Sequence, residues 1–304
     1  MRAEPEAAAL HTLRARLRVP GVQPGAIWQA LTNPARMVRW FQQHQSLLGA
    51  SDGPGQDAMF RGSYHFWSFF TPHAPPDPLH VLLDVRGPQP GDDRLRLHYG
   101  WELHGHRSNI LLDLASSGNG SLVEVEHRGL PEELPGIGSG RVYWTLVLEN
   151  MRLYLLGRGG LRFHEQLRAG EMDIATELFA PAGLNATAAA WELLLASAEQ
   201  GFWLPAGHSA AQTLLREDPH PGGDGALEAR LDLEWQNPQI SLPGVLSWRL
   251  AGREARTRIT VVQSGFGGEH DRDYRLGDWR AVLGQMRSQL EFGADWSQIE
   301  TQEE

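Results

Sequence analysis

The sequence predicts an α+β protein made of two tandem domains, each an antiparallel sheet wrapped around a long C-terminal helix. A pair of tryptophans spaced twelve residues apart occurs twice, as Trp28 and Trp40 and again as Trp191 and Trp203. After each pair come short segments in which apolar and polar residues alternate, as is typical of half-buried strands. Each half then ends in a segment of helical periodicity that begins with a tryptophan.

The internal repeat runs through most of the chain. A displacement of 136 positions aligns residues 94–99 (RLRLHY) with residues 230–235 (RLDLEW), and a displacement of 135 aligns residues 144–155 with residues 279–290. Self-similarity of this extent indicates a duplicated unit. The predicted parts are a first domain at 1–157, a linker at 158–170, a shorter second domain at 171–294 and an acidic, disordered tail at 295–304.

The amino-acid composition of the chain argues against several classes of function. The 304 residues carry a net charge of −10, and residues 161–304 hold the whole excess, with 22 acidic side chains against 12 arginines. An acidic chain is a poor match for nucleic acid, whose phosphates require a basic surface. The absence of cysteine and lysine excludes thiolate and Schiff-base chemistry, and no apolar segment is long enough to span a membrane. We expect a cytoplasmic protein without a cofactor.

The first copy begins with a strand at residues 12–19, where apolar side chains alternate with Thr and Arg. A helix that carries Trp28 follows and ends before Pro34, because the residue preceding a proline avoids the helical region. Short segments bounded by Gly, Pro, Asp or Asn then predict strands at 64–70, 79–85, 95–101, 110–114 and 122–127. From residue 140 the period becomes helical, so we expect a helix there that covers the sheet.

The second copy repeats this order. Its predicted elements are a strand at 171–179, helices up to residue 204, strands at 212–217, 226–235, 245–251 and 257–263, and a last helix at 278–292. The tight glycine-rich segment 219–225 replaces a longer excursion of the first copy, so we expect one strand fewer in this domain. Helices on one face of an antiparallel sheet define an α+β layout.

These motifs resemble the START-like (SRPBCC, polyketide cyclase-like) superfamily. The segments GAIWQALTNPARMVRWF in the first copy and TRITVVQSGFGG in the second carry the resemblance, together with final helices that begin near Trp144 and Trp279. Within the superfamily the pattern is most similar to the branch named for the activator of the heat-shock-protein-90 ATPase. The resemblance implies a helix-grip fold in each copy and no catalytic residues.

A sheet that grips a helix leaves a space between the two, where apolar ligands bind. The candidate ligand-binding residues are those that the predicted elements turn toward this space. They are Trp40, Tyr99, His127, Trp144 and Met151 in the first copy and Trp203, Trp235, Trp248, Gln263 and Trp279 in the second. Because aromatic residues at such positions are more often core than ligand contacts, the tryptophans are also candidates for the core.

His127 is the most informative of these candidates. The period of two that turns Val125 inward also turns His127 inward, and Gln263 occupies the matching position of the second copy. A histidine can act as a general base, but the sequence places no nucleophile or oxyanion donor near it. The alternative is that both side chains hydrogen-bond the turns that follow, at Gly129 and Gly265.

Other motifs give weaker signals. His104 and His106 have the spacing of a metal-binding pair, but no third ligand lies at a recognisable spacing, and we expect no metal site. The GIGSG segment at 136–140 lacks the third glycine of the dinucleotide fingerprint. Glu124 and Glu126 lie on the strand face opposite the valines, so we expect them to be solvated.

We predict a non-enzymatic binding protein that takes a small apolar or aromatic molecule between the sheet and the C-terminal helix. Two alternatives stay open. The acidic second domain favours a co-chaperone-like module that binds a basic surface on a protein partner. The superfamily resemblance allows a cyclase- or dehydratase-like enzyme that depends on His127.

Overall fold

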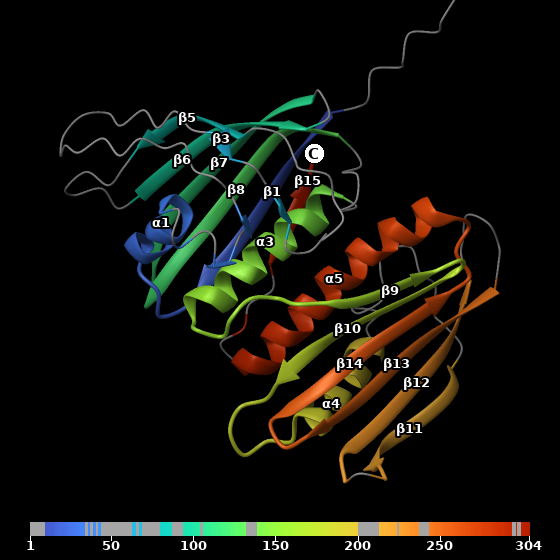
Figure 1. Cartoon of the computed structure of the whole chain (residues 1–304). Helices are drawn as coiled ribbons and strands as arrows, with labels where there is room; N and C mark the ends of the chain where they lie inside the picture. Colours follow the sequence, from blue (N-terminus) through green and yellow to red (C-terminus); the bar gives the residue numbers. More distant parts are fainter. Residues whose placement is uncertain are drawn as a thin grey trace, which may run out of the picture. The chain divides into compact units, whose positions relative to one another are not determined.

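The structure is a computed structural model of the chain (Figure 1). It describes residues 10–33, 36, 39–40, 42–43, 63–64, 67–68, 80–86, 94–103, 106–131, 139–199, 213–223, 225–236, 243–293, 296 and 299–304. The chain divides into two compact units. Unit 1 comprises Met1–Pro135, Ser139–Gly160 and Ser297–Glu304, and unit 2 comprises Gly136–Gly138 and Leu161–Trp296. Unit 1 therefore includes the C-terminal segment, which follows unit 2 in the sequence.

Unit 1 contains an antiparallel sheet with the strand order β15-β1-β8-β7-β6-β5-β3, and helices α1 and α3 contact both this sheet and each other. Its elements are β1 (Leu10–Val19), α1 (Pro24–Thr32), β2 (Gln42–Gln43), β3 (Ser63–Tyr64), β4 (Trp67–Ser68), β5 (His80–Arg86), β6 (Arg94–Leu103), β7 (His106–Ser117), β8 (Gly120–Pro131), α3 (Gly140–Leu155) and β15 (Glu300–Glu303). Strands β2 and β4 pair separately from the sheet. Figure 1 shows α3 lying beside β1 and β15 and running along the strands.

The alternation predicted for the first strand is confirmed. Leu13, Ala15 and Leu17 are at most 3% exposed, whereas Arg14 and Arg16 between them are exposed. Burying each large apolar side chain contributes roughly 1.5–3 kcal/mol. One face of β1 therefore belongs to the core beneath α3, and the other faces solvent.

Local chemistry sets the limits of the helices. α1 begins at Pro24, whose fixed φ suits the first helical turn. α3 follows Ser139, whose hydroxyl accepts a hydrogen bond from the Val142 N–H at 3.3 Å. Gly140 begins α3 at a position where a Cβ would lie 2.7 Å from Leu130 Cδ1. A glycine there allows the start of the helix to lie close to the sheet.

Unit 2 contains an antiparallel sheet with the strand order β11-β12-β13-β14-β10-β9, and its described residues form two helices. Its elements are β9 (His164–Arg168), β10 (Glu171–Phe179), α4 (Ala186–Glu199), β11 (Thr213–Pro221), β12 (Leu227–Gln236), β13 (Pro243–Arg253), β14 (Arg256–Ser264) and α5 (Glu269–Phe292). Trp191 from α4, Trp248 from β13 and Trp279 from α5 lie in one core and are at most 2% exposed. Both units thus have the predicted α+β composition, with helices packed on antiparallel sheets.

The two sheets share a strand order and a register. Strands β1, β8, β7, β6 and β5 of unit 1 lie in the same order as β10, β14, β13, β12 and β11 of unit 2. His127 pairs with Ile110, and Gln263 pairs with Leu246, so both members of the pair are displaced by 136 positions. The displacement found in the sequence is therefore kept in the backbone ladders.

The structure corrects the prediction at three segments. The tail 295–304, predicted to be disordered, contains β15, which pairs with β1. The linker 158–170 contains β9, which pairs with β10. The last helix begins at Glu269 rather than at residue 278, with Glu269 and Asp271 in its first turn, where acidic groups complement the helix dipole. β9 and β15 are polar edge strands. Because main-chain hydrogen bonds hold them in place, their sequences do not show the apolar alternation by which strands are predicted.

Candidate functional site

The inner face of the unit 1 sheet carries a buried polar cluster made of Ser108 on β7, His127 on β8 and Trp144 on α3. Trp144 Nε1 donates a hydrogen bond to His127 Nδ1 at 3.1 Å, and His127 Nε2 lies 2.7 Å from Ser108 Oγ. His127 is 0% exposed. The prediction that His127 faces the interior is confirmed, and the hydrogen bonds described for its ring join the sheet to α3.

These contacts fix the protonation state of His127. An indole N–H can only donate, so Nδ1 must accept, and the neutral ring therefore carries its proton on Nε2 and donates it to Ser108. Burial and, to a smaller extent, the charge of His11 together lower the pKa of His127 to about 3. A general base needs an available lone pair, and that of Nδ1 is engaged by Trp144. The geometry favours a structural role for His127 over a catalytic one.

At the matching position of unit 2, a tryptophan again donates to a buried side chain, but the second polar group of that side chain has no partner among the described residues. Trp279 Nε1 donates to Gln263 Oε1 at 2.6 Å, and Trp279 lies edge-on to Trp248, with ring centroids 5.1 Å apart. Gln263 is 0% exposed, and its Nε2 has no hydrogen-bond partner in the part of the chain that the structure describes. The displacement of 136 places Gly244 where unit 1 has Ser108, so no side chain at this position can accept from the amide.

The other predicted ligand residues fall into two groups. Trp40 and Met151 lie in the unit 1 core and Trp235 lies in the unit 2 core, each at most 2% exposed. The side chain of Tyr99 and the whole of Trp203 lie outside the described residues. The structure thus brings His127 together with Trp144, and Gln263 together with Trp248 and Trp279.

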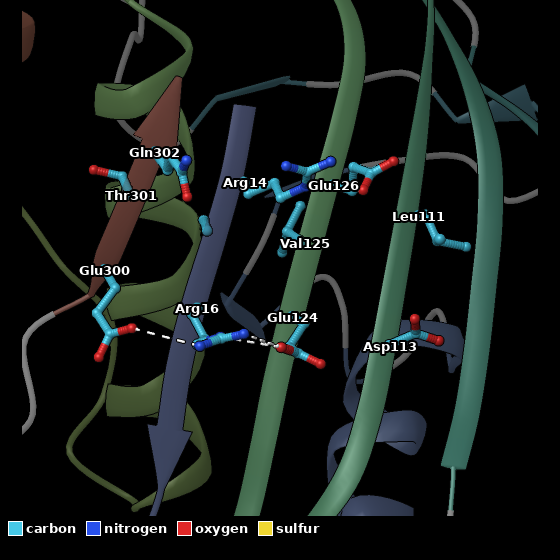
Figure 2. Close-up of a pocket in the computed structure, with 11 residues that line it drawn as sticks. Arg14, Arg16, Leu111, Asp113, Glu124, Val125, Glu126, Glu300, Thr301 and Gln302 are labelled. Atoms are coloured by element: carbon cyan, nitrogen blue, oxygen red, sulfur yellow. Dashed lines mark hydrogen bonds and ion pairs between the residues drawn. The ribbon is translucent and has the colours of Figure 1, made fainter. Parts of the chain in front are cut away.

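The outer face of the unit 1 sheet has an open groove of about 480 Å³ (Figure 2). Its charged lining consists of Arg14, Arg16, Asp113, Glu124, Glu126 and Glu300. Figure 2 shows Arg16 on β1 between Glu124 on β8 and Glu300 on β15, at nitrogen–oxygen distances of 2.8 and 3.9 Å. Cross-strand pairs of this kind contribute roughly 0.2–1 kcal/mol each. The groove is therefore walled by ion pairs that tie neighbouring strands together.

Charges in the groove are paired with their neighbours. Burial acts to raise the pKa of Glu126, but hydrogen bonds from Arg14 and Arg128 outweigh it and hold the pKa below its ordinary value. Glu124 and Glu126 lie on the solvent face, as predicted, with 32% and 20% of their side chains exposed. The sequence does not reveal these pairs, because they depend on the register between β1 and β8.

Two further features concern only the described residues. No group of three or more His, Cys, Asp or Glu side chains among them is arranged to hold a metal ion. No helix in this part of the chain is both long enough and apolar enough to cross a membrane. His104 and the side chain of His106 lie outside the described residues.

Neither a protein-family model nor a curated protein matches the sequence. Among solved structures, CalU16 from Micromonospora echinospora aligns with a TM-score of 0.33 and 20% identity over 51% of this chain and 81% of its own. DynU16, a protein in the dynemicin biosynthetic locus, aligns with a TM-score of 0.33 and 15% identity over 91% of this chain and 95% of its own. CV1439 from Chromobacterium violaceum has a TM-score of 0.33 and 18% identity over 47% and 95%. Similarity at this level does not show that this chain shares a function with any of these proteins.

Proposed function

We propose that the chain is a non-enzymatic binding protein made of two tandem helix-grip domains of the START-like type, related to the heat-shock ATPase-activator branch. Its ligand is a small apolar or aromatic molecule held between the sheet and the long helix of unit 2. The shared strand order and the constant register displacement of 136 support the tandem arrangement. The matched hydrogen bonds from Trp144 to His127 and from Trp279 to Gln263 support it further.

The observation that carries the proposal is the side-chain amide of Gln263. Its oxygen faces the Trp279 indole N–H, and because that group can only donate, the amide NH₂ must point elsewhere. The NH₂ group is buried and has no partner among the described residues. Leaving a buried donor unpaired costs about 1–3 kcal/mol, which a hydrogen bond to a ligand would recover.

The surroundings of Gln263 define the class of ligand. The unit 2 core is apolar and includes Trp235, Trp248 and Trp279, all at most 2% exposed. A mostly apolar molecule with one carbonyl, ether or hydroxyl oxygen would match both the apolar walls and the N–H donor. In unit 1 the corresponding donor, His127 Nε2, already bonds Ser108. We therefore place the ligand in unit 2.

Native mass spectrometry of the purified chain, compared with its denatured mass, tests the proposal. We expect a non-covalent mass excess that denaturation removes. Gln263→Met removes both the donor and the acceptor and should weaken uptake by about tenfold or more. Gln263→His, which introduces the residue type found at position 127, keeps both groups and should retain uptake.

His127→Gln is the matched control in unit 1 and should leave uptake unchanged. Loss of uptake in that variant, with Gln263→Met unaffected, would move the ligand to unit 1 and contradict the assignment. An apo mass, together with no thermal shift across a panel of apolar oxygen-bearing compounds, would contradict the ligand-binding function itself.

A further inference from the structure

The C-terminal strand β15 occupies an edge of the unit 1 sheet. It pairs antiparallel with β1 over residues 300–303. Beyond that pairing, Thr12 and Glu304 exchange two backbone hydrogen bonds, at 2.9 and 2.8 Å. The segment is thus held along its length by main-chain bonds to a single partner strand. An edge strand such as β1 would otherwise present unpaired N–H and C=O groups.

The side chains of this segment add charge and one apolar contact. Arg14 donates to Glu304 at 2.5 Å, and Arg16 lies 3.9 Å from Glu300, on the strand beside it in Figure 2. Both pairs are exposed, and such pairs are worth about 0–1 kcal/mol each. Ile299, directly before β15, is 4% exposed. The segment that pairs with the β1 edge is therefore extended and acidic, and one buried apolar residue directly precedes it.

The corresponding place in unit 2 is filled by a strand that cannot exchange. β9 pairs with β10 and is joined to it by a turn at Ala169 and Gly170, so it is one arm of a hairpin. β15 is attached to β1 only by non-covalent contacts, because it comes from the far end of the sequence. A peptide from another protein could make every one of those contacts, since strand addition to a sheet edge uses main-chain bonds and a few side-chain contacts.

We propose that the β1 edge is a receptor for an extended acidic strand of a protein partner, and that residues 299–304 are an occupant supplied by the chain itself. The partner strand has an apolar residue followed by acidic residues one and five positions later, as in Ile299, Glu300 and Glu304. Binding requires β15 to leave, so β15 is an internal competitor. This surface is independent of the ligand proposed for unit 2.

A peptide-binding experiment tests the proposal directly. The probe is the labelled peptide WSQIETQEE, which has the sequence of residues 296–304, and its binding is measured by fluorescence anisotropy. We expect the chain ending at Gln298 to bind it, and the full chain to bind it at least about tenfold more weakly because β15 competes at high effective concentration. The peptide with Glu300→Lys and Glu304→Lys should bind about tenfold more weakly than the parent, and added salt should weaken the parent.

Full-length variants keep the test decisive if the truncated chain does not fold. Thr12 and Glu304 are a hydrogen-bonded pair, so the alternation of an antiparallel ladder makes Arg14 and Gln302 the next such pair. Gln302→Pro removes a donor to β1 and should open the edge to the peptide. Thr301→Pro is the matched control, because the Thr301 N–H points away from β1, and this variant should bind like the parent chain.

Two outcomes would overturn the proposal. The first is a folded, opened variant that does not bind the peptide, or that binds the charge-reversed peptide equally well. The second is a concentration-dependent dimer of the full chain in sedimentation, abolished by Gln302→Pro but not by Thr301→Pro. That result would assign the edge to strand exchange between copies of this chain.

Discussion

His127 and Gln263 occupy matching positions of the two units, and each supplies a buried acceptor for a tryptophan N–H. One uses an imidazole nitrogen and the other an amide oxygen. Each is fully buried, and each accepts a hydrogen bond from a tryptophan of the helix that covers its sheet. The imidazole also pairs with Ser108, whereas the amide NH₂ of Gln263 has no partner among the described residues. The imidazole can take up a proton, whereas the amide cannot. Unit 1 therefore contains a buried titratable group at this position, and unit 2 does not.

We expect His127→Gln to reduce the acid sensitivity of unit 1. The pKa of His127 is about 3 in the folded chain and about 6.5 when unfolded. Between those values the unfolded state binds the extra proton, so the unfolding free energy falls as the pH drops, by up to about 1.4 kcal/mol per pH unit. Urea unfolding of the parent and the variant from pH 7.5 to 4.5 measures this difference. If the unfolding free energies of the parent and the variant fell equally with pH, His127 would not be the cause of the acid sensitivity.

At the scale of the elements, the hairpin of β13 and β14 depends on a close approach of its strands. A Cβ on Gly252 would lie 2.3 Å from Arg256 O and 2.4 Å from Thr257 Cα, closer than real contacts allow. Glu254 in the connecting turn has a φ of 50°, in the left-handed region that L-residues rarely adopt. The end of this hairpin therefore has no room for a side chain at position 252.

Gly252→Ala should destabilise unit 2 by about 1–3 kcal/mol, because the new methyl group meets backbone atoms that cannot yield without disturbing the ladder. Gly223→Ala is the matched control. A Cβ there has no heavy atom within 4 Å, so the change should be neutral or slightly stabilising. Thermal unfolding of the two variants beside the parent measures the effect, and equal midpoints would show that the approach at Gly252 is not tight.

In the whole molecule, unit 1 is formed by segments that lie on both sides of unit 2 in the sequence. Ser297–Glu304 belongs to unit 1, although unit 2 lies between it and the other parts of unit 1 in the sequence. Within this chain, β1 therefore receives its outer partner from a segment that follows unit 2 in the sequence. The C-terminal segment is an integral part of a sheet whose other strands all precede residue 132.

Removing residues 299–304 should lower the unfolding free energy of unit 1 and leave that of unit 2 unchanged. The loss includes the ladder to β1 and the burial of Ile299, a side chain worth about 1.5–3 kcal/mol when fully buried. Calorimetry of the chain ending at Gln298 measures the shift. His127→Gln and Gly252→Ala identify which transition belongs to which unit. An unchanged unit 1 transition would support the disordered tail that the sequence predicts.

The features that depend on local periodicity could be predicted from the sequence alone. Alternation placed Leu13, Ala15 and Leu17 in the core, and the same period of two turned His127 and Gln263 inward. The displacement of 136 positions shows from the sequence alone that these two residues occupy equivalent positions. Each of these inferences uses only the pattern of side chains within a segment, because a strand or helix that buries one face must repeat its apolar residues at the period of its backbone.

Which segments meet depends on the three-dimensional fold. Ser108 is a partner of His127 because β7 and β8 pair in one register, and Arg16 meets Glu124 for the same reason in β1 and β8. β15 could not be predicted, since a polar edge strand is held by main-chain hydrogen bonds that any residue except proline can make. The unpaired amide of Gln263 is likewise visible only in three dimensions, because it depends on what the fold places around that side chain. Pairing partners and register are non-local, so no segment of the sequence contains them.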